Sequence, residues 1–192
     1  PALAKGIVKR DVIRVITPGT VIESSMLDES KNNYLASVCA TNGNVGMCFI
    51  DISTGEVNLT EFSENVEQRV INEMGRYNPT EIILNKEVVS FNSLKDFISK
   101  KLEASVELLI EEFEFSNAEN LCKEHFNTND LTTLSLNQRD TAVCALGAAL
   151  SYLRSTQKRD LENIRSVNFY TDAKLMSLGI SAIRNLELLE TM

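Results

Sequence analysis

The sequence predicts an α/β domain built on a mixed sheet with flanking helices, followed by an all-α segment. Three observations support this fold class. Strand patterns separated by short turns come first, helix and strand patterns then alternate, and the final part of the chain, residues 159–192, is charged and mostly helical in character. Strands joined by tight turns pair antiparallel, whereas strands joined through helices pair parallel, so the sheet is expected to be mixed.

Three consecutive strands are expected to pair as antiparallel hairpins. Their segments are Tyr34–Ala40, Val45–Ile52 and Glu56–Phe62. Asn42-Gly43, between the first two, is the kind of residue pair that a tight hairpin turn favours, and a second turn at Ser53-Thr54-Gly55 precedes the third. The middle segment is apolar nearly throughout, as expected for a central strand covered on both faces.

Helices and strands then alternate along the chain. In order, we expect a helix over Val66–Tyr77, a strand over Glu81–Leu84, a helix from Ser93 to Leu102, a strand from Val106 to Ile110, a helix opened by a capping box at Ser116–Glu119, and a long helix from about Asn137 to Gln157. The strand alternation slips at Glu111-Glu112 and resumes at Phe113, which predicts a bulge or a bend. This order of elements is typical of a ribonuclease H-like sheet.

The chain is expected to divide where these patterns change. Residues 1–20 form an extended lead-in that ends at the turn signal Pro18-Gly19, residues 21–158 form the α/β domain, and residues 159–192 begin a helical second domain. The chain starts with Pro1 rather than Met and stops in mid-pattern. We therefore expect it to be an internal piece of a longer protein.

Charge and composition argue against several classes of protein. Nineteen basic residues against 27 acidic ones give a net charge of −8. Binding to DNA phosphates depends on a clustered basic excess, and the segment Glu103–Glu124 is instead acidic, so any role on DNA is expected to be indirect. No run approaches the roughly 20 apolar residues that span a membrane. Four cysteines without a CxxC pair indicate reduced thiols in a cytoplasmic protein.

The residues that could carry chemistry do not form a recognisable catalytic set. Ribonuclease H-like nucleases gather several carboxylates around divalent metals, but here only Glu73 fits such a position, and Asp51 is expected to fix the following hairpin by accepting from backbone amides. No glycine precedes a lysine, so a phosphate loop of the Walker type is absent. His125, the only histidine, and Cys122 are too few for a zinc site. We assign no catalytic, cofactor-binding or metal-binding residue.

Several segments of the chain, in the same order, resemble the MutS family of DNA mismatch-repair proteins. They are Gly6–Thr20, which contains Arg14-Val15-Ile16-Thr17-Pro18-Gly19-Thr20, then Asn32–Leu35, Asp51–Glu56, Phe126–Leu131, Tyr152–Gln157 and Arg184–Leu188. The first and last are the most specific of these matches. Together they cover nearly the whole chain.

The resemblance implies a particular domain organisation. Residues 1–20 would lead in from a mismatch-binding domain, residues 21–158 would be a ribonuclease H-like connector without nuclease activity, and the chain from Arg159 would begin the helical core, or lever, domain. The family's mismatch wedge, a Phe-x-Glu motif, lies upstream of the Thr-Pro-Gly-Thr segment. Phe62-Ser63-Glu64 matches its letters at the wrong place, and Gly179 and Ile183 stand where the family usually has Asp and Arg.

The resemblance also implies a function and partners. The connector would couple mismatch recognition to a distant ATPase and dock MutL, with hinges at the lead-in before Thr20 and at Tyr152–Gln157. Mismatched double-stranded DNA, ATP and magnesium would be bound by other parts of a homodimeric parent protein. Two alternatives stay open: a metal-dependent nuclease using Asp51 and Glu73, and a MutS-like protein that acts outside mismatch repair.

Overall fold

A mixed sheet of six strands forms the centre of the fold. The computed structural model describes residues 15, 17–21, 32–157 and 161–171. The strands are β1 (Tyr34–Thr41), β2 (Asn44–Asp51), β3 (Glu56–Phe62), β4 (Glu81–Leu84), β5 (Ser105–Leu108) and β6 (Asn168–Phe169). The α-helices are α1 (Val66–Tyr77), α2 (Asn92–Lys101), α3 (Phe115–His125) and α4 (Asp140–Gln157). The 3-10 turns are η1 (Pro18–Thr20), η3 (Glu87–Ser90), η4 (Glu111–Phe113) and η5 (Leu131–Leu134).

The strand order is β5-β4-β1-β2-β3-β6. Strands β1, β2 and β3 pair antiparallel, whereas β4 pairs parallel with β1, β5 with β4, and β6 with β3. Asn42 and Gly43, with φ of 52° and 81°, form the tight turn between β1 and β2, because both positions need a left-handed backbone. The predicted hairpins and the mixed sheet are therefore confirmed.

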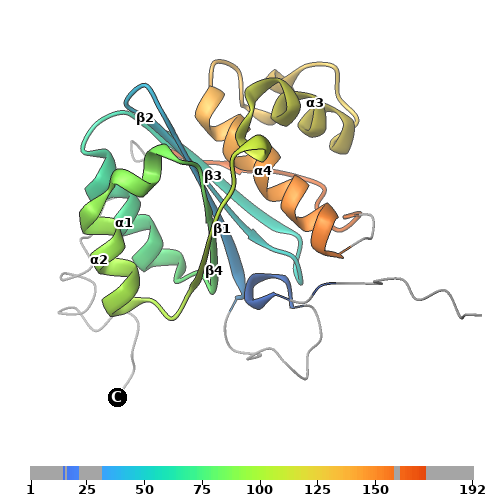
Figure 1. The fold of residues 1–192 in the computed structure, drawn as a ribbon. Coiled ribbons are helices and arrows are strands. Elements are labelled where there is room, and N and C mark those ends of the chain that lie inside the picture. Colours follow the sequence, from blue (N-terminus) through green and yellow to red (C-terminus); the bar gives the residue numbers. More distant parts are fainter. Residues whose placement is uncertain (1–14, 16, 22–31, 158–160, 172–192) are drawn as a thin grey trace, which may run out of the picture.

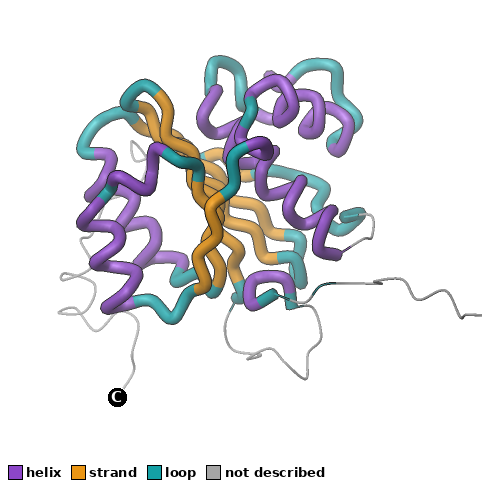
Figure 2. The backbone as a smooth tube through the Cα atoms, viewed as in Figure 1, coloured by secondary structure: helices purple, strands orange, loops and turns teal. Residues whose placement is uncertain are grey.

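Helices cover both faces of the sheet, with α1 and α2 on one side and α3 and α4 on the other (Figure 1, Figure 2). Alternate residues of β1 enter different cores: Leu35 and Cys39 face α4, whereas Ala36 and Val38 face α1. Period-two alternation of side chains on a strand explains this division. It also explains why β2 has no polar side chain between Val45 and Ile50, since both of its faces are covered.

Glycines bring α3 and α4 unusually close to their neighbours. A Cβ built on Gly46 of β2 would lie 2.1 Å from the carbonyl carbon of Thr141, in the first turn of α4. A Cβ on Gly147 of α4 would lie 2.4 Å from the Cα of Ala118 on α3. Only residues without a side chain fit at these two crossings, so the first fixes α4 on the sheet and the second fixes α3 on α4.

One local prediction was correct only in part, and another was wrong. The chain does bend at Ile110 and turns through η4 toward α3, but β5 ends at Leu108 and the strand does not resume at Phe113. Ser116 does not cap a helix, because α3 begins at Phe115, with Glu114 at its N-cap position and no side-chain capping bond. The predicted capping box begins two residues after the observed N-cap.

The helical character expected for residues 159–192 is not observed between Leu161 and Thr171. Leu161 and Ile164 enter the same core as α4, and β6 extends the sheet beside β3. Residues 158–160 and 172–192, with Gly179 and Ile183, lie outside the part of the chain that the structure describes. Among the described helices, none is both long and apolar enough to cross a membrane.

Candidate interdomain junction

The lead-in segment and the end of α4 meet at the end of the sheet where β1 begins (Figure 1). The backbone N–H of Val15 donates to the carbonyl oxygen of Thr156 over 2.8 Å. The side-chain amide of Gln157 donates to the carbonyl oxygen of Thr20 over 3.1 Å. Two segments that are more than a hundred residues apart in sequence are thus hydrogen-bonded to each other. These are the two segments for which the family resemblance implied hinges.

A buried carboxylate, Glu81, lies at the centre of this contact. Glu81 is the first residue of β4 and is 3% exposed. One carboxylate oxygen, Oε2, accepts from the Thr17 hydroxyl over 2.6 Å and from the Gly19 N–H over 3.0 Å. The other, Oε1, accepts from the Tyr152 hydroxyl over 2.7 Å. We call Glu81 with Thr17, Gly19 and Tyr152 the Glu81 junction.

The local sequence explains how the lead-in reaches this carboxylate. Pro18 fixes the first position of η1, and the Thr17 N–H donates to the Thr20 hydroxyl over 3.0 Å, which closes the turn. Gly19 has no side chain, and a Cβ there would lie 2.7 Å from the Cβ of Glu81. The Thr-Pro-Gly-Thr sequence therefore makes a turn narrow enough to place two donors on one buried oxygen.

A second set of hydrogen bonds holds η1 against the sheet. The Asn33 side-chain amide donates to the Pro18 carbonyl over 2.8 Å, and its oxygen accepts from the Thr80 hydroxyl over 2.7 Å. The Asn33 N–H donates to the Asp51 carboxylate over 3.3 Å. Residues at the start of β1, the end of β2 and the start of β4 thus all support the same turn.

Burial keeps the hydroxyl of Tyr152 protonated. The pKa of Tyr152 is raised, mainly by burial and further by its hydrogen bond to Glu81. Its hydroxyl is therefore a stable donor at neutral pH. A buried carboxylate is costly unless its oxygens are hydrogen-bonded, and three donors divided between the lead-in and α4 meet that need.

The carboxylates weighed for a nuclease have structural partners. Asp51 accepts from the Ser53 N–H over 2.8 Å and from the Ser53 hydroxyl over 2.6 Å, so it fixes the hairpin as the sequence predicted. Glu73 accepts from the Tyr170 hydroxyl over 2.6 Å and lies 3.6 Å from the Arg76 guanidinium. Across the ranges that the structure describes, no group of three or more His, Cys, Asp or Glu side chains could hold a metal ion.

His125 and Cys122 also have structural surroundings. The Nε2 of His125 is hydrogen-bonded to the Ile164 carbonyl oxygen over 2.9 Å, which joins α3 to the segment after α4. Burial lowers the pKa of this imidazole. Cys122 is fully buried, and burial raises its pKa to about 12. Phe62 is buried at the end of β3 with the Arg69 guanidinium 4.2 Å from its ring centre, so it is no exposed wedge.

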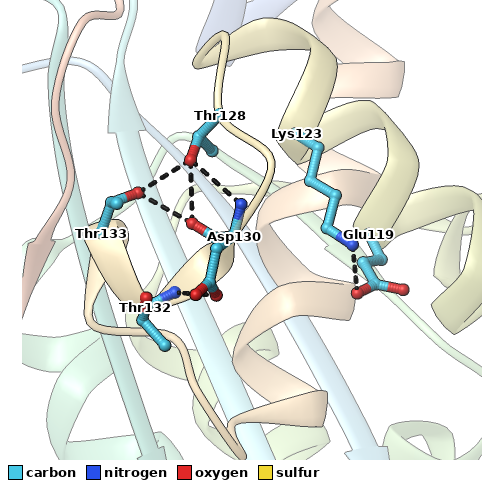
Figure 3. A network of polar contacts seen from close by, with 6 residues as sticks. All are labelled: Glu119, Lys123, Thr128, Asp130, Thr132 and Thr133. Atoms are coloured by element: carbon cyan, nitrogen blue, oxygen red, sulfur yellow. Dashed lines mark hydrogen bonds and ion pairs between the residues drawn. The ribbon is translucent and has the colours of Figure 1, made fainter.

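The segment Phe126–Leu131 forms a turn between α3 and η5. Asp130 accepts from the Thr132 N–H over 2.9 Å and caps η5, while its carbonyl oxygen accepts from the hydroxyls of Thr128 and Thr133, both over 2.9 Å (Figure 3). The hydrogen bond from Thr132 to the side chain lowers the pKa of the Asp130 carboxyl. The polar residues of this segment therefore stabilise the turn in which they lie.

Sequence reasoning missed Glu81 as a functional residue. It placed Glu81 only as the start of an apolar strand, and it placed Tyr152 on the exit helix without a partner. One signal was present: an acid that opens the otherwise apolar run Ile82-Ile83-Leu84 must be buried with it or lie at its margin. The partner residues could not be inferred, because they lie 62 to 71 positions away in sequence.

The fold and the junction define an α/β module in which the segment before β1 and the end of α4 meet on one buried carboxylate. Residues 33–165 match the family model for MutS domain II. The chain is 44% identical, over its whole length, to the DNA mismatch repair protein MutS of Ruminiclostridium cellulolyticum, of which it covers 22%. It is 42% identical over 98% of its length to MutS of Alkaliphilus metalliredigens, and 35% identical over 99% to MutS of Methanococcoides burtonii, with 22% of each relative covered.

The chain belongs to the MutS family, and the matched region is domain II, the connector of these mismatch-repair proteins. It spans about a fifth of the length of the curated relatives it matches. Most of a full-length relative therefore lies outside the matched region.

Proposed function

We propose that this chain is a non-catalytic connector that couples mismatch recognition on one side to ATP turnover on the other. The observation that supports this is the Glu81 junction, in which the lead-in and the exit helix use the two oxygens of one buried carboxylate. A displacement of either segment changes the hydrogen bonds available to the other. Coupling of this kind is a free-energy linkage carried by an element with two arrangements.

The finer description of the fold belongs to the same proposal. Three antiparallel strands followed by two parallel strands that enter through helices support a ribonuclease H-like connector. We propose a lead-in over residues 1–20 and a connector that begins at residue 21 and extends past residue 158, with a helical core domain only later in the chain. The packing of Leu161 and Ile164 against α4 supports counting residues 161–171 with the connector.

The partners follow from the family and belong to the whole protein. We infer a cytoplasmic, homodimeric parent that binds mismatched double-stranded DNA and uses ATP and magnesium in a domain beyond this chain. The net charge of −8 supports an indirect role of the connector on DNA. We also infer that the connector offers a surface to a MutL-type protein.

The coupling is tested in a chimera in which this chain replaces the matching segment of the Ruminiclostridium cellulolyticum relative. Tyr152→Phe removes the hydrogen bond between α4 and Glu81 without leaving a cavity. Tyr34→Phe is the matched control, because its hydroxyl contacts Glu56 rather than the junction. The readout is the ratio of ATP turnover with mismatched duplex to that with perfectly paired duplex.

We expect Tyr152→Phe to change this ratio by about fivefold, the factor that about 1 kcal/mol of coupling represents. ATP turnover without DNA should stay unchanged, because the ATPase site is not touched. Tyr34→Phe should leave the ratio at its original value. Equal ratios in all three proteins would contradict the proposal.

Docking of MutL is tested by calorimetric titration of this chain with the N-terminal domain of the MutL protein from the same organism. Saturable one-to-one binding supports a docking surface on the connector. The same titration is repeated on the chimera with ATP and mismatched duplex bound. Absence of saturable binding in both forms would contradict the docking part of the proposal.

A further inference from the structure

Strand β5 is an open edge of the sheet. It is the outermost strand beside β4, and all four of its residues are exposed. Proteins usually protect such an edge, because its unpaired backbone groups can pair with another extended chain. Within the part of the chain that the structure describes, β4 is the only strand that pairs with β5.

Among the described residues, no strand pairs with the side of β5 that faces away from β4. The Ser105 N–H donates to the Thr80 carbonyl oxygen and the Leu109 N–H to the Leu84 carbonyl oxygen, both over 3.0 Å. Successive backbone groups of a strand point to opposite sides, so the N–H and C=O groups of Val106 and Leu108 point away from β4. These are the groups that a further strand would use.

The side chains along this edge are apolar and exposed. Val106 is 47% exposed, Leu108 is 49% exposed, and Ile110, just after the strand, is 64% exposed. Val106 and Leu108 stand beside Ile82 and Leu84 of β4, so they continue the apolar face under α1 and α2 to its margin. Ile110 and Phe115 line a cavity of about 450 Å³ at the end of β5.

The segment that forms this edge and the turns after it is acidic. From Leu102 to Phe115 the sequence contains no lysine or arginine but five glutamates: Glu103, Glu107, Glu111, Glu112 and Glu114. The lysines nearest in sequence, Lys100 and Lys101, end α2 before the strand, and Lys86 lines the cavity at its far end. A second copy of this chain would bring the same acidic residues opposite themselves, which is unfavourable. An extended segment with basic side chains complements both the free backbone and the charge.

We propose that β5 is a docking edge for an extended, basic segment of a partner protein, which adds to the sheet as a further strand. Its apolar side chains contact Val106 and Leu108, and its lysines or arginines face the glutamates around the strand. This mode of recognition draws affinity from main-chain hydrogen bonds and specificity from alternate side chains. It uses the margin of the sheet opposite β6 and does not depend on the Glu81 junction or on the coupling proposal.

The test uses three synthetic peptides and measures their binding to the unaltered 192-residue chain by fluorescence anisotropy. The first alternates lysine and valine, the second has the same sequence with every backbone amide N-methylated, and the third replaces lysine by glutamate. We expect saturable binding of the first and binding at least about tenfold weaker for the other two, because one loses its backbone donors and the other its charge complementarity. Equal affinity for the methylated peptide would overturn the proposal.

Variants of the chain locate the site. Leu108→Pro removes one outward N–H but leaves the inward donors of Ser105 and Leu109, so the sheet is expected to persist, as thermal unfolding can verify. Its matched control, Leu108→Thr, keeps the N–H. We expect the proline variant to weaken binding about tenfold and the threonine variant to weaken it less.

Backbone NMR shifts on adding the lysine-valine peptide should be confined to Val106–Ile110 and to β4. Shifts spread over the acidic surface instead, away from the edge, would overturn the proposal. This holds even if Leu108→Pro fails to fold, because the peptide comparison and the NMR map use the unaltered chain.

Discussion

Glu81 illustrates how much a single side chain can contribute to the arrangement of two distant segments. A buried carboxylate loses its hydration, and here three neutral donors replace it. Two of these donors belong to the lead-in and one to α4. The residue therefore stabilises the fold only when both segments are in place.

We expect Glu81→Gln to lower the free energy of unfolding by about 1–3 kcal/mol, because an amide has one acceptor oxygen where the carboxylate has two. Urea denaturation at neutral pH measures this. Glu107→Gln, on the exposed strand β5, is the control and should change stability by less than about 0.5 kcal/mol. A loss at position 81 no larger than at position 107 would show that the junction contributes nothing to stability.

His125 is expected to make the fold sensitive to acid. Burial lowers the pKa of its imidazole below the ordinary value of 6.5. Between pH 6.5 and this lower folded-state pKa, the unfolded chain binds more protons at His125 than the folded chain does. The contribution of neutral His125 to stability is therefore fully present above pH 6.5 and is lost as the pH falls through the folded-state pKa. The imidazole signals of the only histidine report that pKa by NMR. In His125→Gln, the part of the loss of stability at low pH that comes from His125 should disappear. If the variant loses stability with falling pH as much as the original chain, other groups are responsible.

At the scale of elements, the contact between β2 and α4 sets the position of the longest helix. We expect Gly46→Ala to destabilise the protein by about 1–3 kcal/mol or more, because the new Cβ would overlap the backbone of Thr141 and force α4 away. Asn44→Ala, at the exposed start of the same strand, should have little effect. Comparison of the two melting temperatures provides the check, and similar values would mean that α4 can shift freely on the sheet.

The sequence was informative wherever an element is determined by its neighbours in the chain. The hairpin at Asn42-Gly43 and the helix Val66–Tyr77 were predicted to within a residue or two, because turn residues and apolar spacing are local signals. β6 is only two residues long, and its pairing with β3 depends on a contact 110 positions away, so no local pattern could reveal it. The Glu81 junction could not be predicted for the same reason. The lead-in and the end of α4 were each expected to be a hinge, but nothing local in the sequence indicated that they contact each other.

At the scale of the whole molecule, charge separates the connector from a DNA-binding surface. With a net charge of −8, the chain should show no saturable binding to duplex DNA, matched or mismatched, at about 0.15 M salt. Gel-shift titration tests this, with the full-length chimera as the positive control. Saturable binding that weakens steeply with added salt would reveal a basic surface that composition does not suggest.

The nuclease alternative is tested on the same duplexes. Because Asp51 and Glu73 accept hydrogen bonds from Ser53 and Tyr170, we expect no cleavage with magnesium or manganese. Asp51→Asn should lower the melting temperature by loosening the β2–β3 hairpin. The variant, like the original chain, should show no cleavage. Metal-dependent cleavage abolished by Asp51→Asn or Glu73→Gln would restore the enzyme interpretation.

The contact between Val15 and Thr156 has a mechanical consequence. Because the path through the α/β body returns to the point at which it began, a pull between the lead-in and the end of α4 is borne first by the few hydrogen bonds that join them. Under tension the two segments would therefore part while the body between them keeps its shape, and they would rejoin when the tension is released.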